Sequence, residues 1–275
     1  MADASKGVIT EPRLVELKAD WTFHETTTPN VAKTSDGFIM AFAGRRGRYD
    51  NRRLFIAKSD TLDGPWEVSA QSYSPSNPWE GRNIDLGPGN ITEGNSILFF
   101  YSSAYPRLSQ IATAFLRRPH IPSESNLMRY EKRRIGILRV GIREPRTING
   151  SACPLPLKCI PGTSFESVFC PGYTTIDDHH LFFVVGSNYS LGYPFEQSIG
   201  VVESQSSPTA WDTEQEIRSI ITSKDLPPPF SDHPAFDTPD VVPTGGSTLK
   251  LHFSVMSRGI DRWSIMACDL TADCS

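Results

Sequence analysis

One pattern of strands and turns occurs four times along the 275-residue chain. Each copy has a proline near the start of an extended segment, a turn containing Gly or Asp, an apolar strand, a polar loop and a further strand. The copies begin at Thr28, Gly87, Cys170 and Thr238, so the period is about 60 to 80 residues. A unit of this size cannot bury its apolar face alone, so neighbouring copies are expected to stack on one another.

A fourth strand completes the first three copies after a turn such as Gly64-Pro65-Trp66. The predicted fourth strands are residues 67–73, 155–160 and 216–222. The last copy ends before its fourth strand, and residues 8–17 (VITEPRLVEL) are expected to supply it and so close a ring. The predicted fold class is therefore all-β, a β-propeller of four blades formed by residues 1–275 as one domain, with a fifth degenerate blade as the alternative.

The charge and hydropathy of the chain exclude two classes of partner. The formal net charge is -4 at pH 7 and Lys and Arg are scattered along the chain. Nucleic acid requires a basic stripe, so neither nucleic acid nor an anionic membrane is an expected partner. No apolar run reaches the roughly 20 residues of a membrane-spanning helix. We therefore expect a small-molecule substrate, and these features do not determine the oligomeric state.

Cysteines, sequons and cofactor motifs add little to the assignment. The five cysteines include no CxxC pair, and their spacing is compatible with small disulfide loops or with thiols. Sequons stand at Asn90, Asn149 and Asn188. No P-loop, HExxH motif or dinucleotide fingerprint occurs, so we expect no metal and no cofactor. We predict a secreted protein or one in the lumen of the secretory pathway, with the cytoplasm as the alternative.

The blade pattern resembles the β-propellers of the clan that contains the family 43 glycoside hydrolases, and more loosely the fructan hydrolases. The segments that carry the resemblance are Pro29-Asn30-Val31, Asp36-Gly37-Phe38, Ala57-Lys58-Ser59, Gly64-Pro65-Trp66, and Gly87-Pro88-Gly89-Asn90 ahead of Leu98-Phe99-Phe100-Tyr101-Ser102-Ser103. They cover most of the chain but belong to the scaffold, so they indicate the fold more than the chemistry. Topology places the expected site where the innermost strands converge on the axis.

The resemblance implies a set of carboxylates at this site. Glycosidases use one carboxyl group as an acid and another as a base or nucleophile, about 5 to 10 Å apart. In family 43 these groups stand beside the prolines that begin the inner strands, yet the residues before the aligned prolines here are not acidic. Asp85, Glu166 and Asp237 lie within a few residues and form the predicted triad, with solvated loop acids as the alternative.

Basic and aromatic residues are also expected on this face. Arg45, Arg46 and Arg48 beside Tyr49 are suited to clamp an anionic or carbonyl oxygen, or else form a solvated loop cluster. His233 is a further candidate, with a purely structural role as the alternative. Thr28, Asn30 and Asn90, at the starts of inner strands, are expected to contact the substrate. The aromatic candidates for the wall of the site are Phe169, Tyr173, Phe195 and Trp263.

The absence of acids beside the prolines favours a different chemistry. In chain size, propeller pattern and sequons the chain resembles the fungal hetero-Diels-Alderases of tropolone and phenol sesquiterpenoid pathways, which join an ortho-quinone methide to a humulene-type alkene. Such a cycloaddition needs a shaped apolar pocket and a donor that polarises the carbonyl group. Here Arg45, Tyr105 or His233 would donate to the oxygen, and Asp237 would orient the donor or help a precursor to lose water.

Three hypotheses therefore follow from the sequence. The leading one is the stereoselective cycloaddition in an apolar axial pocket. The alternative is a glycoside hydrolase that acts on an arabinan- or xylan-type substrate with Asp85, Glu166 and Asp237. The third is a carbohydrate-binding propeller without catalytic activity, which would present a shallow, open face.

Overall fold

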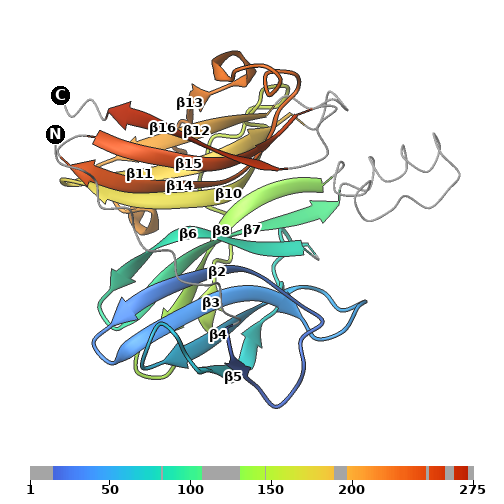
Figure 1. Cartoon of the computed structure of the whole chain (residues 1–275), viewed down its shortest axis with the longest axis vertical. Coiled ribbons are helices and arrows are strands. Elements are labelled where there is room, and N and C mark those ends of the chain that lie inside the picture. The colour runs from blue at the N-terminus through green and yellow to red at the C-terminus, as the bar shows by residue number, and fades with distance from the viewer. Residues whose placement is uncertain are drawn as a thin grey trace, which may run out of the picture.

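The protein is represented by a computed structural model that describes residues 15–81, 83–106, 131–145, 147–188, 197–245, 248–257 and 263–271. These residues form four β-sheets and two short 3-10 helices, at Pro208–Ala210 and Ser223–Asp225. Within these ranges no helix is long and apolar enough to cross a membrane. The predicted all-β class and the four-bladed propeller arrangement are confirmed (Figure 1).

Blade I is built from the first repeat and has the strand order β1-β5-β4-β3-β2. Its strands are β1 (Leu17–Lys18), β2 (Glu25–Thr34), β3 (Gly37–Arg45), β4 (Arg53–Ser59) and β5 (Trp66–Tyr73). Strands β3 and β4 are buried on both faces, which is why they are almost continuously apolar in sequence. The turn at Gly64-Pro65-Trp66 leads into β5, as the sequence predicts.

Blades II, III and IV repeat this meander with fewer strands. Blade II contains β6 (Asn83–Glu93), β7 (Ser96–Pro106), β8 (Glu131–Gly141) and β9 (Thr147–Gly150). Blade III contains β10 (Ser167–Ile176), β11 (His179–Ser187), β12 (Gln197–Ser204) and β13 (Arg218–Ile221). Blade IV contains β14 (Ala235–Gly245), β15 (Thr248–Met256) and β16 (Ser264–Thr271). All strand pairs within these three blades are antiparallel.

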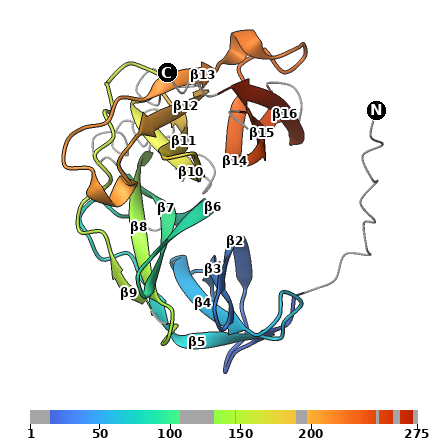
Figure 2. The same ribbon diagram turned by 90° about the vertical axis from the view of Figure 1, so that its left-hand side faces the viewer.

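The inner strands β2, β6, β10 and β14 pack in this order around the axis. Figure 2 shows the four sheets as an arc, with the inner strands on its concave side. Glycines allow two of the closest approaches, because a Cβ atom at Gly87 would lie 1.7 Å from the carbonyl oxygen of Pro171 and one at Gly172 would lie 2.3 Å from that of Pro239. The inner strands can therefore approach this closely only because residues 87 and 172 are glycines without a side chain.

One detail of the predicted blades is wrong, and a second is not supported by the residues that the structure describes. The fourth strand of blade II is β9, whereas residues 155–160 contribute only an isolated bridge between Leu157 and Gln215. The N-terminal strand β1 pairs in parallel with β5 of blade I, so the described part of residues 8–17 does not complete blade IV. Residues 8–14 lie outside the described residues. Blade IV therefore has three strands within the described ranges.

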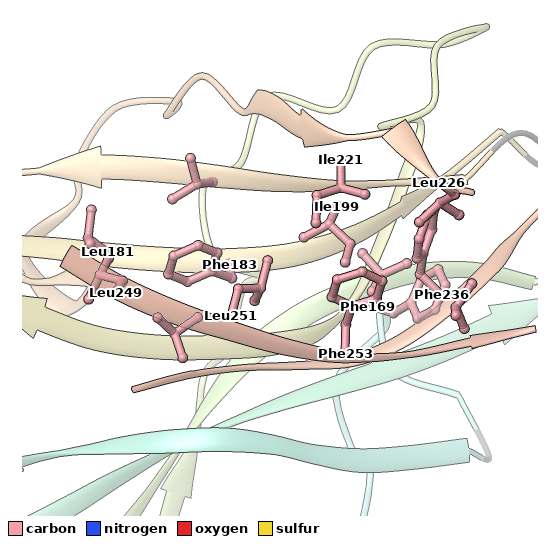
Figure 3. Packing of buried hydrophobic residues seen from close by; sticks show 14 of the residues in the cluster. Phe169, Leu181, Phe183, Ile199, Ile221, Leu226, Phe236, Leu249, Leu251 and Phe253 are labelled. Atoms are coloured by element: carbon pink, nitrogen blue, oxygen red, sulfur yellow. The ribbon is translucent and has the colours of Figure 1, made fainter. Parts of the chain in front are cut away.

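Three apolar cores lie between consecutive blades. One joins blades I and II, a second joins blades II and III, and the largest joins blades III and IV. In this last core Phe169, Phe183 and Phe253 meet side chains of β12 and β14 (Figure 3). Because each core is shared by two sheets, every blade depends on its neighbour for burial of its apolar face.

Candidate functional site

Each inner strand carries a β-bulge at its proline, at the same level of the propeller. The ladder to the second strand shifts register between Thr27 and Asn30, Leu86 and Asn90, Phe169 and Gly172, and Asp237 and Asp240. Thr28, Cys170 and Thr238 have φ angles of 47°, 47° and 49°, a region that residues other than glycine rarely adopt. Bulges and strained backbone gather near functional sites, so this level of the axis is the candidate site.

Three acidic residues precede these bulges on different blades. Glu25 begins β2, Asp85 lies near the start of β6, and Asp237 lies near the start of β14. The inner strands β6 and β14 contact each other across the axis. The fold therefore brings carboxylates from blades I, II and IV to one end of the propeller.

Two arginines join the acids of blades I and II. Arg45 and Arg52 both bind the carboxylate of Glu25, and Arg52 Nη1 also donates to Asp85 Oδ1 at 2.7 Å. These side chains are 16 to 27% exposed, so the network is reached by solvent but is screened less than surface pairs. The network fixes the position of Asp85 relative to blade I.

Asp85 is an acid of the network whose carboxyl pKa is raised. Burial is the largest influence and raises the pKa of its carboxyl group above the ordinary value of 3.8. The guanidinium groups of Arg52 and Arg133 lower this pKa, whereas the charges of Asp237 and Glu25 raise it. Because burial and the neighbouring carboxylates outweigh the arginines, Asp85 is suited to hold a proton at pH values where an ordinary aspartate is ionised.

Asp237 has a different partner, the thiol of Cys170. Cys170 Sγ donates to Asp237 Oδ1 at 2.6 Å and joins blades III and IV. Burial and the charge of Asp237 raise the pKa of the Cys170 thiol well above its ordinary value, so the sulfur keeps its proton and remains a donor. Asp85 and Asp237 are thus two acids whose environments differ, which is the usual arrangement for an acid and a base.

Three of the predicted contact residues form hydrogen bonds between blades I and II. Asn30 Nδ2 donates to the carbonyl oxygens of Gly87 and Gly89 at 2.7 and 2.8 Å, and Asn90 Nδ2 donates to Asn30 Oδ1 at 2.9 Å. Thr28 Oγ1 accepts from the backbone N–H of Leu86 at 3.3 Å. The structure therefore places these three side chains at the seam between blades I and II.

The predicted aromatic wall is mostly part of the cores. Phe169 is 4% exposed in the core of blades III and IV, with the guanidinium of Arg133 4.7 Å above its ring. Tyr173 packs on Phe100 and its hydroxyl group bonds His180 Nδ1 at 2.7 Å. Trp263 is 49% exposed at the start of the segment that leads into β16. Phe195 lies outside the described residues.

The other predicted residues have mixed outcomes. Arg45 binds Glu25, so it belongs to the site but acts on a carboxylate of the protein. Tyr105 pairs with Lys132 in the ladder of β7 and β8. His233 has a φ of 46° and an exposed side chain 3.9 Å from Asp232. Glu166 is 4% exposed and accepts from the backbone N–H of Gly162 at 3.3 Å, at the loop before β10.

Sequence reasoning missed Glu25 and Arg52. Glu25 lies four residues before Pro29, much as the predicted Asp85 lies three before Pro88, so the same count applied to the first repeat would have found Glu25. Arg52 belongs to the same Arg-rich loop as Arg45, and nothing in the sequence distinguishes it from the other arginines of that loop. Within the described ranges, no group of three or more His, Cys, Asp or Glu side chains is arranged to hold a metal ion.

Known proteins are similar to this chain in fold but not detectably in sequence. No protein-family model and no curated protein matches the sequence. An exo-1,5-α-L-arabinanase from a bovine ruminal metagenomic library has a TM-score of 0.58 at 9% identity, over 90% of this chain and 75% of that chain.

Two further structures are similar. The α-L-arabinanase of Cellvibrio cellulosa complexed with arabinohexaose has a TM-score of 0.54 at 10% identity, over 90% of this chain and 74% of that chain. The GH32 β-fructofuranosidase of Bombyx mori has a TM-score of 0.56 at 11% identity, over 94% of this chain and 47% of that chain. At these identities the similarity confirms the predicted resemblance to glycoside hydrolase propellers as a resemblance of fold.

Proposed function

We propose that the chain is a glycoside hydrolase in which Asp85 is the general acid and Asp237 is the general base. The observation that carries this proposal is the pair itself. Two carboxyl groups from β6 and β14 lie close enough for the charge of Asp237 to raise the pKa of Asp85. Hydrolysis of a glycosidic bond needs such a pair, with one member protonated and the other ionised.

The proposed reaction uses Asp85 as the proton donor and Asp237 as the proton acceptor. Asp85 gives its proton to the glycosidic oxygen as the bond from that oxygen to the anomeric carbon breaks. A water oxygen forms a bond to the anomeric carbon, and Asp237 takes a proton from this water. Cys170 positions Asp237 by donating to Oδ1, which leaves the other carboxylate oxygen for the water. Glu25 holds Arg52, and Arg52 positions Asp85.

The assignment revises the predicted triad. Asp85 and Asp237 remain members of the predicted triad, while Glu25 replaces Glu166 as a positioning residue. The arabinanases and the β-fructofuranosidase with the same fold support a carbohydrate substrate by analogy. The arabinan- or xylan-type substrate therefore remains the starting point for assays.

The cycloaddition hypothesis has less support and stays a prediction. It requires an apolar wall at the axis, yet Phe169 and Tyr173 pack at the cores between blades. Its proposed donor Arg45 is engaged with Glu25. A binding propeller without catalysis needs no acid of perturbed pKa, so Asp85 favours the hydrolase over this third hypothesis.

Variants of the two acids test the proposal. The purified protein is assayed with aryl arabinofuranosides and xylosides, and released aryl alcohol is measured. Asp85→Asn and Asp237→Asn should each lower kcat/KM by about 10²- to 10⁴-fold, because loss of an acid or base costs this much. Activity should fall as pH rises through the raised pKa of Asp85.

Asp240→Asn is the matched control, since Asp240 is an exposed acid on the same strand. It should leave kcat/KM within about twofold of the wild type. Equal losses in all three variants would contradict the assigned roles. A wild type that releases no aryl alcohol, but forms one enantiomer of a quinone-methide adduct, would restore the cycloaddition hypothesis.

A further inference from the structure

A strongly basic loop adjoins the candidate site. The loop joins β3 to β4, and residues 45–53 contain five arginines and one aspartate in a chain of net charge -4. Two of these arginines, Arg45 and Arg52, bind Glu25. Arg46 and Arg48 have exposed side chains, and neither forms an ion pair with a carboxylate in the part of the chain that the structure describes.

The loop has a defined shape because it is fixed at both ends and in its middle. Arg45 and Arg52 fix its ends on the same carboxylate. A turn closes the middle, where Gly47 N donates to Asp50 Oδ2 at 2.8 Å and Asp50 N donates to the carbonyl oxygen of Gly47 at 3.2 Å. The two exposed guanidinium groups are therefore carried on an ordered loop that is tied to the network around Asp85.

A packed aromatic ring holds the guanidinium group of Arg46, and an exposed one lies near that of Arg48. The Cζ atom of Arg46 lies 3.6 Å from the ring centroid of Trp21, which itself packs against Phe23 and Phe55. The Cζ atom of Arg48 lies 5.8 Å from the ring centroid of Tyr49. Stacking covers one face of a guanidinium and leaves its N–H edge for an anion, and it removes part of the entropy cost of binding. The N–H groups on the free edge of such a guanidinium can donate two parallel hydrogen bonds to the two oxygens of a carboxylate.

We infer that Arg46 and Arg48 bind a carboxylate of the substrate, so that the glycan cleaved at the axial acids contains uronic acid residues. The inference rests on the proposed hydrolase function for the cleavage step, whereas the anion site itself rests on the loop. A neutral arabinan or xylan would leave both guanidinium groups without a ligand. The planar fork of Arg favours a carboxylated sugar, and a sulfated glycan serves as a comparison in the test.

Binding is measured by titration calorimetry at about 50 mM salt with oligogalacturonate, its methyl ester and a neutral arabino-oligosaccharide. The wild type should bind oligogalacturonate at least about tenfold more tightly than the methyl ester. The double variant Arg46→Gln with Arg48→Gln should lose this preference. Arg46→Lys should weaken binding by several-fold, because it keeps the charge and loses the planar fork.

Arg218→Gln is the matched control, because Arg218 is an exposed arginine on β13 of blade III. Equal weakening by this variant, equal binding of the methyl ester, or equal binding of a sulfated oligosaccharide would overturn the inference. The Asp85→Asn variant separates the two proposals, since it should bind oligogalacturonate normally and fail to cleave it. Cleavage of neutral substrates without a preference for acidic ones would contradict the anion site and leave the hydrolase proposal intact.

Discussion

Blades I and IV lie at the two ends of the arc, and each has an outward face, which is the side of its sheet turned away from the neighbouring blade. The two blades bury different fractions of these outward faces. In blade I, Met40 and Phe42 of β3 point away from blade II and pack with Phe55 and Trp66 in a second apolar cluster. The segment before β2 contributes Trp21 and Phe23, which cover this cluster. In blade IV, Lys250 and His252 of β15 point away from blade III, and Ile265 of β16 is 80% exposed.

The difference shows two ways to end a stack of sheets. Each inner blade buries apolar side chains on both faces, so a terminal blade must either cover its outward face or make it polar. Blade I keeps an apolar outward face and covers it with its own N-terminal segment. Blade IV directs Leu249, Leu251 and Phe253 inward and polar side chains outward, so it needs less cover.

The largest effect is expected inside blade IV, where the two faces of one strand are compared. Phe253→Ala removes a ring that is 4% exposed and lies 5.8 Å from the ring of Phe236. It should lower the free energy of unfolding by about 3 to 5 kcal/mol, measured by urea denaturation. His252→Ala, one residue away on the outward face, should cost less than about 1 kcal/mol. Similar costs for the two variants would show that the outward face is also packed.

A smaller effect is expected at the cover of blade I. Trp21→Ala exposes part of the rings of Phe23 and Phe55 and should cost about 2 kcal/mol in the same experiment. Ile265→Ala on blade IV should change stability by less than about 0.5 kcal/mol, because its side chain is already exposed. If Ile265→Ala destabilised the protein as much as Trp21→Ala, blade IV would also have a cover.

The smallest effect on stability is expected at Glu25, the axial carboxylate of blade I. Burial raises the pKa of Glu25, but hydrogen bonds from Arg45 and Arg52 outweigh burial and lower it below its ordinary value of 4.5. A lowered pKa stabilises the fold above the unfolded pKa, and this contribution is lost as pH falls through the folded pKa.

Glu25→Gln should therefore reduce stability at neutral pH by about 1 kcal/mol or less and flatten the loss of stability below about pH 5. Thermal unfolding from neutral to acidic pH measures this. Cys170→Ala on blade III is the comparison, because it removes the thiol donor of Asp237 and leaves both arginines in place. A steeper acid dependence in Glu25→Gln than in the wild type would contradict the role assigned to the arginine pair.

The repeat predicted the blades well because it rests on local chemistry. Prolines, Gly and Asp turns and alternating apolar residues determine where strands start and end, and the three strands of blade IV follow the predicted segments. The predicted fourth strand of blade II failed because Leu157 is apolar and buried without being part of a ladder. Burial in a loop and burial in a strand leave the same signal in the sequence.

The site residues stay predictions, and the structure shows only where each of them lies. Asp85 and Asp237 were chosen as candidates because they are acids near the aligned prolines. Asn30 and Asn90 were assigned to the substrate, yet they bond to each other across blades I and II. A polar residue at the start of an inner strand serves either purpose, and only the neighbouring blade decides which.

The sequence by itself determined four repeated sheets and the position of most of their turns. These follow from steric and hydrophobic rules that act over a few residues. The tertiary structure alone decided that Glu25 shares Arg52 with Asp85 and that Cys170 donates to Asp237. These contacts join residues 27 to 67 positions apart, and their pKa effects depend on burial and distance, which local sequence patterns do not encode.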